Sequence, residues 1–140
     1  MKNVYEIFEE FEKATKRQDR VNILKFNDNF ALRSILQGTF DNRIQFVFDE
    51  IPAYKASDSP PGLGYTNINT EMHRAYLFEA NNPKVAPGLT LQRRKEILIQ
   101  MLEAMEAKEA EIFVNMLRKK QNVKGLTRDI VMEALPGIIQ

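Results

Sequence analysis

The chain has 140 residues, of which 44% are hydrophobic and 28% are charged, and its formal net charge is +1. This length fits one domain with a single core, and the composition excludes a disordered tail and a membrane-spanning protein. Without cysteine, and with one histidine, the chain has no thiol chemistry and a poor ligand set for a structural zinc ion, so we expect no metal or cofactor. Since no apolar run approaches the length of about 18–20 residues that spans a bilayer, and the start of the chain lacks a signal-peptide core, we expect a cytoplasmic protein.

Apolar residues at helical spacing predict two helices at the start of the chain. The first contains Val4, Phe8 and Phe11, and the second follows Thr15, whose hydroxyl is a suitable N-cap. Residues 13–25, which contain this second helix, form a strongly basic segment with Asp19 as its one acid. Its cations are Lys13, Lys16, Arg17, Arg20 and Lys25.

Two further helices are expected before the first proline. Asp28 is a plausible N-cap for a third helix, which should end near Gly38. Asp41 is the expected cap of a short fourth helix over residues 41–51, and Pro52 stops it because proline has no backbone N–H to donate.

The central part of the chain lacks periodicity. Residues 52–70 are rich in proline, glycine and serine and predict a long loop, either a contact surface or a connector packed across the core by Tyr54 and Tyr65. Thr70 is expected to cap a short helix, and a second break follows at residues 81–89.

The last third of the chain is again helical. Thr90 is expected to open the longest helix, and apolar residues at helical spacing in 112–117 and 126–134 predict a final pair. Because no region alternates apolar and polar residues for long enough to build a sheet, we predict an all-α fold. Residues 1–140 should form a single compact domain of about seven or eight helices.

Candidates for catalytic or metal chemistry are few. His73 lacks an orienting partner and a nucleophile nearby in the sequence, which favours a structural or surface role. Glu103, Glu106 and Glu109 fall on roughly one side of a predicted helical run, but no histidine accompanies them, so a metal cluster is weakly supported. We therefore expect a protein that is not an enzyme.

The segment 118–128 contains five cations and no acid. Gly125 lets the backbone turn tightly between two predicted helices, and Thr127 offers both a helix cap and a hydroxyl for a phosphate oxygen. Together with the basic second helix, this segment suits the backbone of duplex DNA, which it would bind without sequence preference and with strong salt dependence. The predicted DNA-binding residues are Thr15, Lys16, Arg17, Arg20, Arg118, Lys119, Lys120, Lys124, Gly125, Thr127 and Arg128.

Several short stretches occur in an order and spacing that resemble a known domain. Near the N-terminus they are Ala14-Thr15-Lys16-Arg17, Val21-Asn22-Ile23-Leu24 and Asn27-Asp28-Asn29-Phe30-Ala31-Leu32-Arg33. Near the C-terminus they are Glu111-Ile112-Phe113, Arg118-Lys119-Lys120, the turn at Gly125, Ile130-Val131 and Leu135-Pro136-Gly137-Ile138-Ile139. These stretches resemble the N-terminal DNA-binding domain of phage-type ATP-dependent DNA ligases.

The resemblance implies an all-helical domain that lies on the minor groove across a nick and holds the duplex by its phosphates. It does not imply ligation, since no Lys-x-Asp-Gly nucleophile motif occurs in the chain. Residues 52–89 depart most from the ligase pattern, so no DNA contact is carried over there. The residues to which it assigns phosphate contacts are Thr15, Lys16, Arg17, Lys119, Lys120, Lys124, Gly125, Thr127 and Arg128.

Two functions of different class remain open. The first is a non-catalytic protein that grips duplex or nicked DNA, as a phage replication or repair accessory. The second is a protein-interaction module, an adaptor or inhibitor, that binds a replication or host protein through the same helical scaffold and does not bind DNA. The acid-rich first helix favours the second function, whereas the two basic segments favour the first if they lie on one face.

Overall fold

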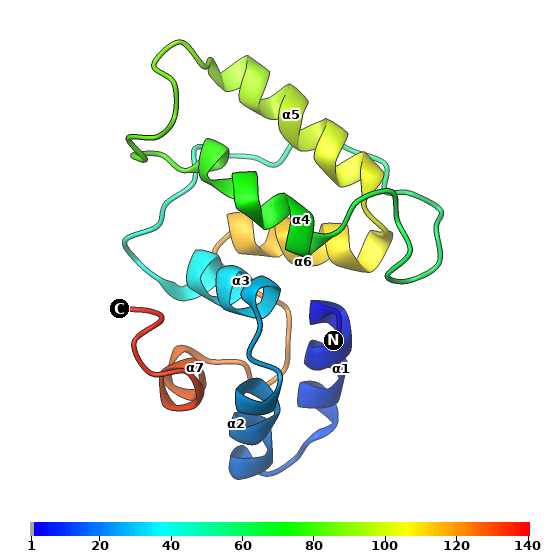
Figure 1. Cartoon of the computed structure of the whole chain (residues 1–140), viewed down its shortest axis with the longest axis vertical. Coiled ribbons are helices and arrows are strands. Elements are labelled where there is room, and N and C mark those ends of the chain that lie inside the picture. The colour runs from blue at the N-terminus through cyan, green and yellow to red at the C-terminus, as the bar shows by residue number, and fades with distance from the viewer. Residues whose placement is uncertain (1) are drawn as a thin grey trace.

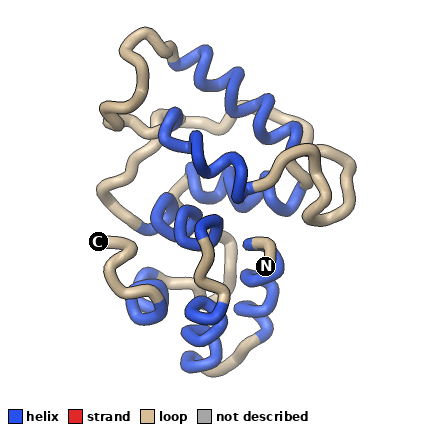
Figure 2. The backbone as a smooth tube through the Cα atoms, in the orientation of Figure 1, coloured by secondary structure: helices blue, strands red, loops and turns tan. Residues whose placement is uncertain are grey.

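A computed structural model describes residues 2–140. In this part of the chain, helices are joined by loops and turns, and there is no β-strand (Figure 2). The predicted all-α class is therefore confirmed. Seven α-helices and one 3₁₀-helix, η1, make up the described part of the chain. Their bounds are α1 Val4–Lys13, α2 Arg17–Phe26, α3 Phe30–Phe40, α4 Ile68–Glu71, η1 Met72–Phe78, α5 Leu91–Ala104, α6 Ala107–Leu117 and α7 Arg128–Ala134. None of these helices combines the length and the apolar character that a bilayer crossing requires.

The helices gather in two groups about α3 (Figure 1). At one end of the long axis, α2 packs against both α1 and α7, which brings the N-terminal third beside the C-terminus. At the other end lie α4, η1 and α5. The two groups are joined by α6, which contacts both α1 and α3.

Aromatic and aliphatic side chains fill one core between these helices. Phe11, Phe78 and Phe113 are fully buried, and the last two meet edge to face with ring centroids 6.2 Å apart. Gly38 allows α6 to approach α3 closely, because a Cβ at this position would overlap the side chain of Met116. Burial of these side chains is the main favourable term in folding.

The predicted helix over residues 41–51 is wrong. The Asp41 carboxylate, almost fully buried, accepts hydrogen bonds from the backbone and the side chain of Arg43, so the chain turns there instead of continuing as a helix. Beyond this turn the backbone is extended and pairs with the end of η1: Val47 donates to the Phe78 carbonyl at 2.9 Å, and Ala80 donates to the Gln45 carbonyl at 2.7 Å. Tertiary pairing has thus overridden the helical spacing of the apolar residues.

Two predicted helix caps are displaced, and a third is confirmed. Asn29, and not Asp28, caps α3 by accepting from the Leu32 N–H at 2.9 Å, while Asp28 pairs with a nearby arginine. Asn67 caps α4 where Thr70 was expected. Thr90 caps α5, the longest helix, as predicted.

The long loop before α4 is tied to the junction of α5 and α6. Ser57 donates to the Met105 carbonyl at 3.0 Å, and Gly64 lies so close that a Cβ would come 2.6 Å from the Glu106 backbone nitrogen. Tyr54 packs against the core as expected, but Tyr65 is 89% exposed and does not. Polar backbone contacts, more than aromatic packing, therefore fasten this loop.

Candidate nucleic-acid interface

The start of α2 is basic and lacks a side-chain cap. The helix begins at Arg17, and the N-cap is Lys16, so the prediction that Thr15 caps it is wrong. Thr15, Lys16 and Arg17 are all exposed. Because no side chain accepts from the first-turn N–H groups, the positive end of the helix dipole adds to the charge of these cations.

Arg20 joins this helix start to the C-terminal turn. Its Nε donates to the Ala14 carbonyl at 2.8 Å, and its guanidinium lies 5.5 Å from the centroid of the Phe11 ring. The same guanidinium touches Gly125, where a Cβ would overlap it. Gly125 has a φ of +83°, a left-handed conformation that glycine adopts without strain. The two basic segments predicted from the sequence therefore meet at Arg20 and Gly125.

Packing between α2 and α7 fixes the two segments further. Arg17 forms an ion pair with Glu133 of α7 at 3.1 Å. Thr127 caps α7 as predicted, since its hydroxyl accepts from the Ile130 N–H at 3.4 Å. The turn before α7 is closed by a hydrogen bond from the Leu126 N–H to the Val123 carbonyl at 3.2 Å.

The basic residues at the end of α6 adopt a Schellman motif. The Lys119 N–H donates to the Met116 carbonyl at 2.9 Å, and the Lys120 N–H donates to the Asn115 carbonyl at 3.0 Å. Lys119 occupies the position that glycine usually takes, with a φ of +63°, and is the one non-glycine residue among the described residues with a positive φ. A lysine in this strained conformation indicates that its side chain has a specific partner.

That partner is the C-terminal end of α3. The Lys119 ammonium donates to the carbonyl oxygens of Gly38, Asp41 and Ile44 at 2.6, 2.9 and 2.6 Å. Burial lowers the pKa of Lys119, while the charges of Asp41 and Glu79 act in the opposite direction. All three N–H bonds of the ammonium are therefore directed at carbonyl oxygens of the protein, and the predicted phosphate contact by Lys119 would have to compete with them.

Arg128 has a similar structural role. Its guanidinium donates to the Phe40 carbonyl at the same end of α3, and the side chain is half-buried. Cations stabilise the negative end of a helix dipole. Lys119 and Arg128 therefore act together as a C-terminal cap of α3, and the Arg128 guanidinium already has a partner within the protein.

The remaining cations near the turn form what we call the basic corner, defined as Lys16, Arg17, Arg20, Lys120 and Lys124. Lys120 and Lys124 are exposed and line a cavity of about 460 Å³ together with Glu12. The Glu12 carboxylate accepts from the Lys124 backbone N–H at 3.2 Å. This acid at the end of α1 was not anticipated, because only the folded chain brings it to the turn.

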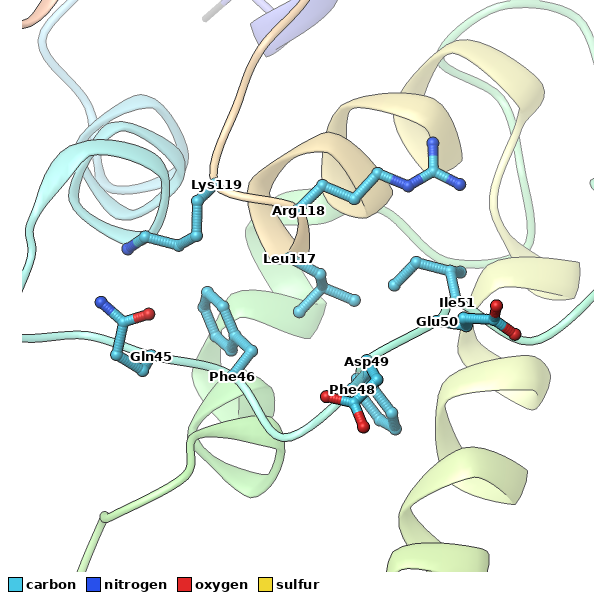
Figure 3. Close-up of a pocket in the computed structure, with 9 residues that line it drawn as sticks. All are labelled: Gln45, Phe46, Phe48, Asp49, Glu50, Ile51, Leu117, Arg118 and Lys119. Carbon is cyan, nitrogen blue, oxygen red and sulfur yellow. The ribbon is translucent and has the colours of Figure 1, made fainter.

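Arg118 lies apart from the basic corner. It is exposed at the rim of a cavity of about 590 Å³, between the end of α6 and the extended segment 45–51 (Figure 3). Lys119 lines both this cavity and the one at the basic corner, so the two cavities adjoin at this residue. Sequence reasoning missed this second cavity, because it assigned residues 45–51 to a helix.

The other candidates for chemistry are dispersed. His73 is exposed and stacks on Phe30, with ring centroids 4.4 Å apart. Glu103 is in α5, whereas Glu106 caps α6 and Glu109 is buried within it, so the three acids do not share one helix face. Within residues 2–140, no group of three or more potential ligands could hold a metal ion.

Comparison with known proteins identifies a family. A family model matches residues 7–123, more than four fifths of the chain, and the chain belongs to this family, described as a family of unknown function (DUF6433). The match begins within α1 and includes α2 to α6 and the residues Arg118 to Lys120, but it ends before Lys124 and α7. No curated protein matches the sequence.

Proposed function

We propose that this protein binds the phosphate backbone of duplex or nicked DNA through the basic corner, without catalysing a reaction. The observation that carries this proposal is the contact between the Arg20 guanidinium and Gly125. This contact joins two basic segments that are about a hundred residues apart in the sequence. The resemblance to the DNA-binding domain of phage-type DNA ligases, which rests on the same segments, agrees with this function.

The chemistry of the basic corner suits phosphate better than bases. Lys16, Arg17, Lys120 and Lys124 offer ammonium and guanidinium groups, which bind phosphate oxygens in any sequence context. The uncapped start of α2 adds oriented N–H donors. Such contacts release counterions from DNA, so the affinity should fall steeply as the salt concentration rises.

The proposal is tested by fluorescence anisotropy titrations of intact and nicked duplexes at several salt concentrations. Replacing Lys16 and Lys124 with Gln should weaken binding to all sequences alike and reduce the log–log salt slope by about 1.8, since each phosphate contact contributes about 0.9. A matched control replaces Lys55 and Lys84, two exposed lysines in the irregular segments before α4 and α5, and should leave the slope unchanged. Equal effects of the two double substitutions would mean that DNA responds only to total charge.

A second function, the protein-interaction module, has its own structural support. Phe26 is 82% exposed at the end of α2, and Phe30 follows at the start of α3 with 44% exposed, stacked on His73. Exposed large aromatic side chains are enriched at protein interfaces. If the chain fails to bind duplex DNA at low salt, this aromatic surface becomes the first site to test by substitution of Phe26.

A further inference from the structure

The cavity of about 590 Å³ at Arg118 has the composition of a nucleotide site (Figure 3). Phe46 and Phe48 supply aromatic walls from the extended segment 45–51, and Leu117 adds an apolar surface from α6. Asp49 and Glu50 line the same cavity, and Arg118 stands across from them at its rim. An aromatic wall, acceptors and a cation are what a base and its phosphate require.

Three charged side chains that line this cavity have no partner among the described residues. Within residues 2–140, Asp49, Glu50 and Arg118 form no side-chain hydrogen bond or ion pair, in contrast to the buried Asp41, which pairs with Arg43 at 2.6 Å. The side chains of Asp49, Glu50 and Arg118 are exposed and free to meet a ligand. Their charges therefore contribute no salt bridge to the fold.

The walls of the cavity, in contrast, are held in place. The ring of Phe48 packs against Phe78 with centroids 5.6 Å apart, and the Lys119 ammonium lies 5.7 Å from the centroid of the Phe46 ring. Lys119 is itself held by hydrogen bonds to three carbonyl oxygens, so the backbone at the neighbouring Arg118 is held in place as well. A site that is already organised loses less entropy when it binds a ligand.

The geometry points to an unpaired guanine nucleotide as the occupant. A planar base can stack on the aromatic wall, and ionised carboxylates can only accept hydrogen bonds, so they favour a base edge that carries N–H donors. Guanine presents both its ring N–H and its exocyclic amino group on one edge, whereas thymine presents one N–H between two carbonyl oxygens that a carboxylate repels. Arg118 is suited to the phosphate, because a guanidinium binds phosphate oxygens in a bidentate manner.

A guanine site would add to the proposed function. That its natural ligand is part of a DNA strand rests on that proposed function. Asp49 and Glu50 are suited to the N–H edge of a base, which is paired in an intact duplex, so the cavity should accept a base that has left the stack. Lys119 lines both this cavity and the one at the basic corner, and a DNA strand held at Lys120 would be two residues from Arg118. DNA with an unpaired guanine should therefore bind more tightly than a blunt duplex.

Isothermal titration calorimetry with mononucleotides tests the site directly, since the chain has no tryptophan to report binding. We expect GMP to bind more tightly than TMP, and more tightly than guanosine, which lacks the phosphate. The double substitution Asp49→Asn and Glu50→Gln should weaken GMP binding about tenfold and reduce the preference over TMP, because two charged acceptors are lost. The control, Asp58→Asn with Glu96→Gln, removes two exposed acids outside the cavity. It should change neither the affinity for GMP nor the preference over TMP.

The outcomes separate this inference from the proposed function. Equal binding of GMP and TMP, or no binding of either at millimolar concentration, overturns the guanine site even if duplex DNA binds. GMP binding that persists when Lys16 and Lys124 are replaced with Gln supports an independent nucleotide site, whether or not duplex binding is lost. A GMP affinity that the Asp49 and Glu50 substitutions leave unchanged shows that the nucleotide binds elsewhere, and refutes the assignment.

Discussion

Replacement of Lys119 tests whether a buried ammonium caps α3, as its three hydrogen bonds indicate. Lys119→Met keeps much of the aliphatic side chain but removes the donors to Gly38, Asp41 and Ile44. A buried acceptor left without a donor costs about 1–3 kcal/mol. Because Lys119 is only half-buried, water will satisfy part of this set, and we expect a loss of about 2–4 kcal/mol in the free energy of unfolding.

Lys119→Gly separates the contribution of the ammonium hydrogen bonds from the cost of the left-handed backbone conformation at this position. Glycine also lacks the ammonium, but it adopts the left-handed conformation, φ +63°, without the penalty of about 1–2 kcal/mol that other residues carry. The glycine variant should therefore be less stable than the native protein and more stable than the methionine variant. Lys120→Met is the matched control, because Lys120 is exposed and its side chain has no hydrogen-bond partner within residues 2–140.

Urea unfolding followed by far-UV circular dichroism measures these differences, with a common m-value as the check that the folded states are comparable. A methionine variant as stable as the native protein would show that the three hydrogen bonds contribute nothing. A glycine variant less stable than the methionine variant would refute the strain argument. Loss of stability at Lys120 equal to that at Lys119 would mean that charge alone is responsible.

Three other substitutions probe the turn, the buried acid and the loop. Gly125→Ala should lower the free energy of unfolding, measured in urea, by more than Gly137→Ala, since both positions have a positive φ but only Gly125 touches a guanidinium. Burial raises the pKa of Glu109, so the folded protein holds a proton that the unfolded chain releases, and stability should rise as the pH falls toward 4.5. Glu109→Gln should flatten this rise in the thermal midpoint. Gly64→Ala should destabilise the chain and expose the loop before α4 to limited proteolysis, because the added Cβ meets the backbone of Glu106.

Much of the fold could be predicted from local features. Helical periodicity gave the all-α class, and the caps at Thr90 and Thr127 follow from their own sequence neighbourhoods. The error at residues 41–51 has a physical cause: Ile44, Phe46 and Phe48 alternate with the period of an extended chain, while Ile44, Val47 and Ile51 also fit a helix. Only the backbone pairing with η1, more than thirty residues away, decides between the two.

The candidate site was less predictable, because its residues take their roles from distant partners. Lys119 looks like a surface cation in the sequence, and its role is set by carbonyl oxygens 75 to 81 residues earlier. Glu12 lies 112 residues from the Lys124 N–H that it accepts from. By contrast, Gly125 was recognised as a turn from its local sequence, since the need for a positive φ is a local property.

The formal net charge of +1 does not favour DNA binding by itself, so the proposed function depends on where the charges lie. Lys119 and Arg128 donate to carbonyl oxygens at the end of α3, so they are less available to a phosphate than the exposed cations are. Two carboxylates contact the basic corner: Glu12 accepts from the Lys124 N–H at 3.2 Å, and Glu133 forms an ion pair with Arg17 at 3.1 Å. Under the proposed function, a phosphate oxygen would compete with these two carboxylates for the same donors. Because such competition acts at contact distance, whereas net charge acts through a field that salt screens within about 8–10 Å, a neutral protein would lose long-range steering but keep local phosphate recognition.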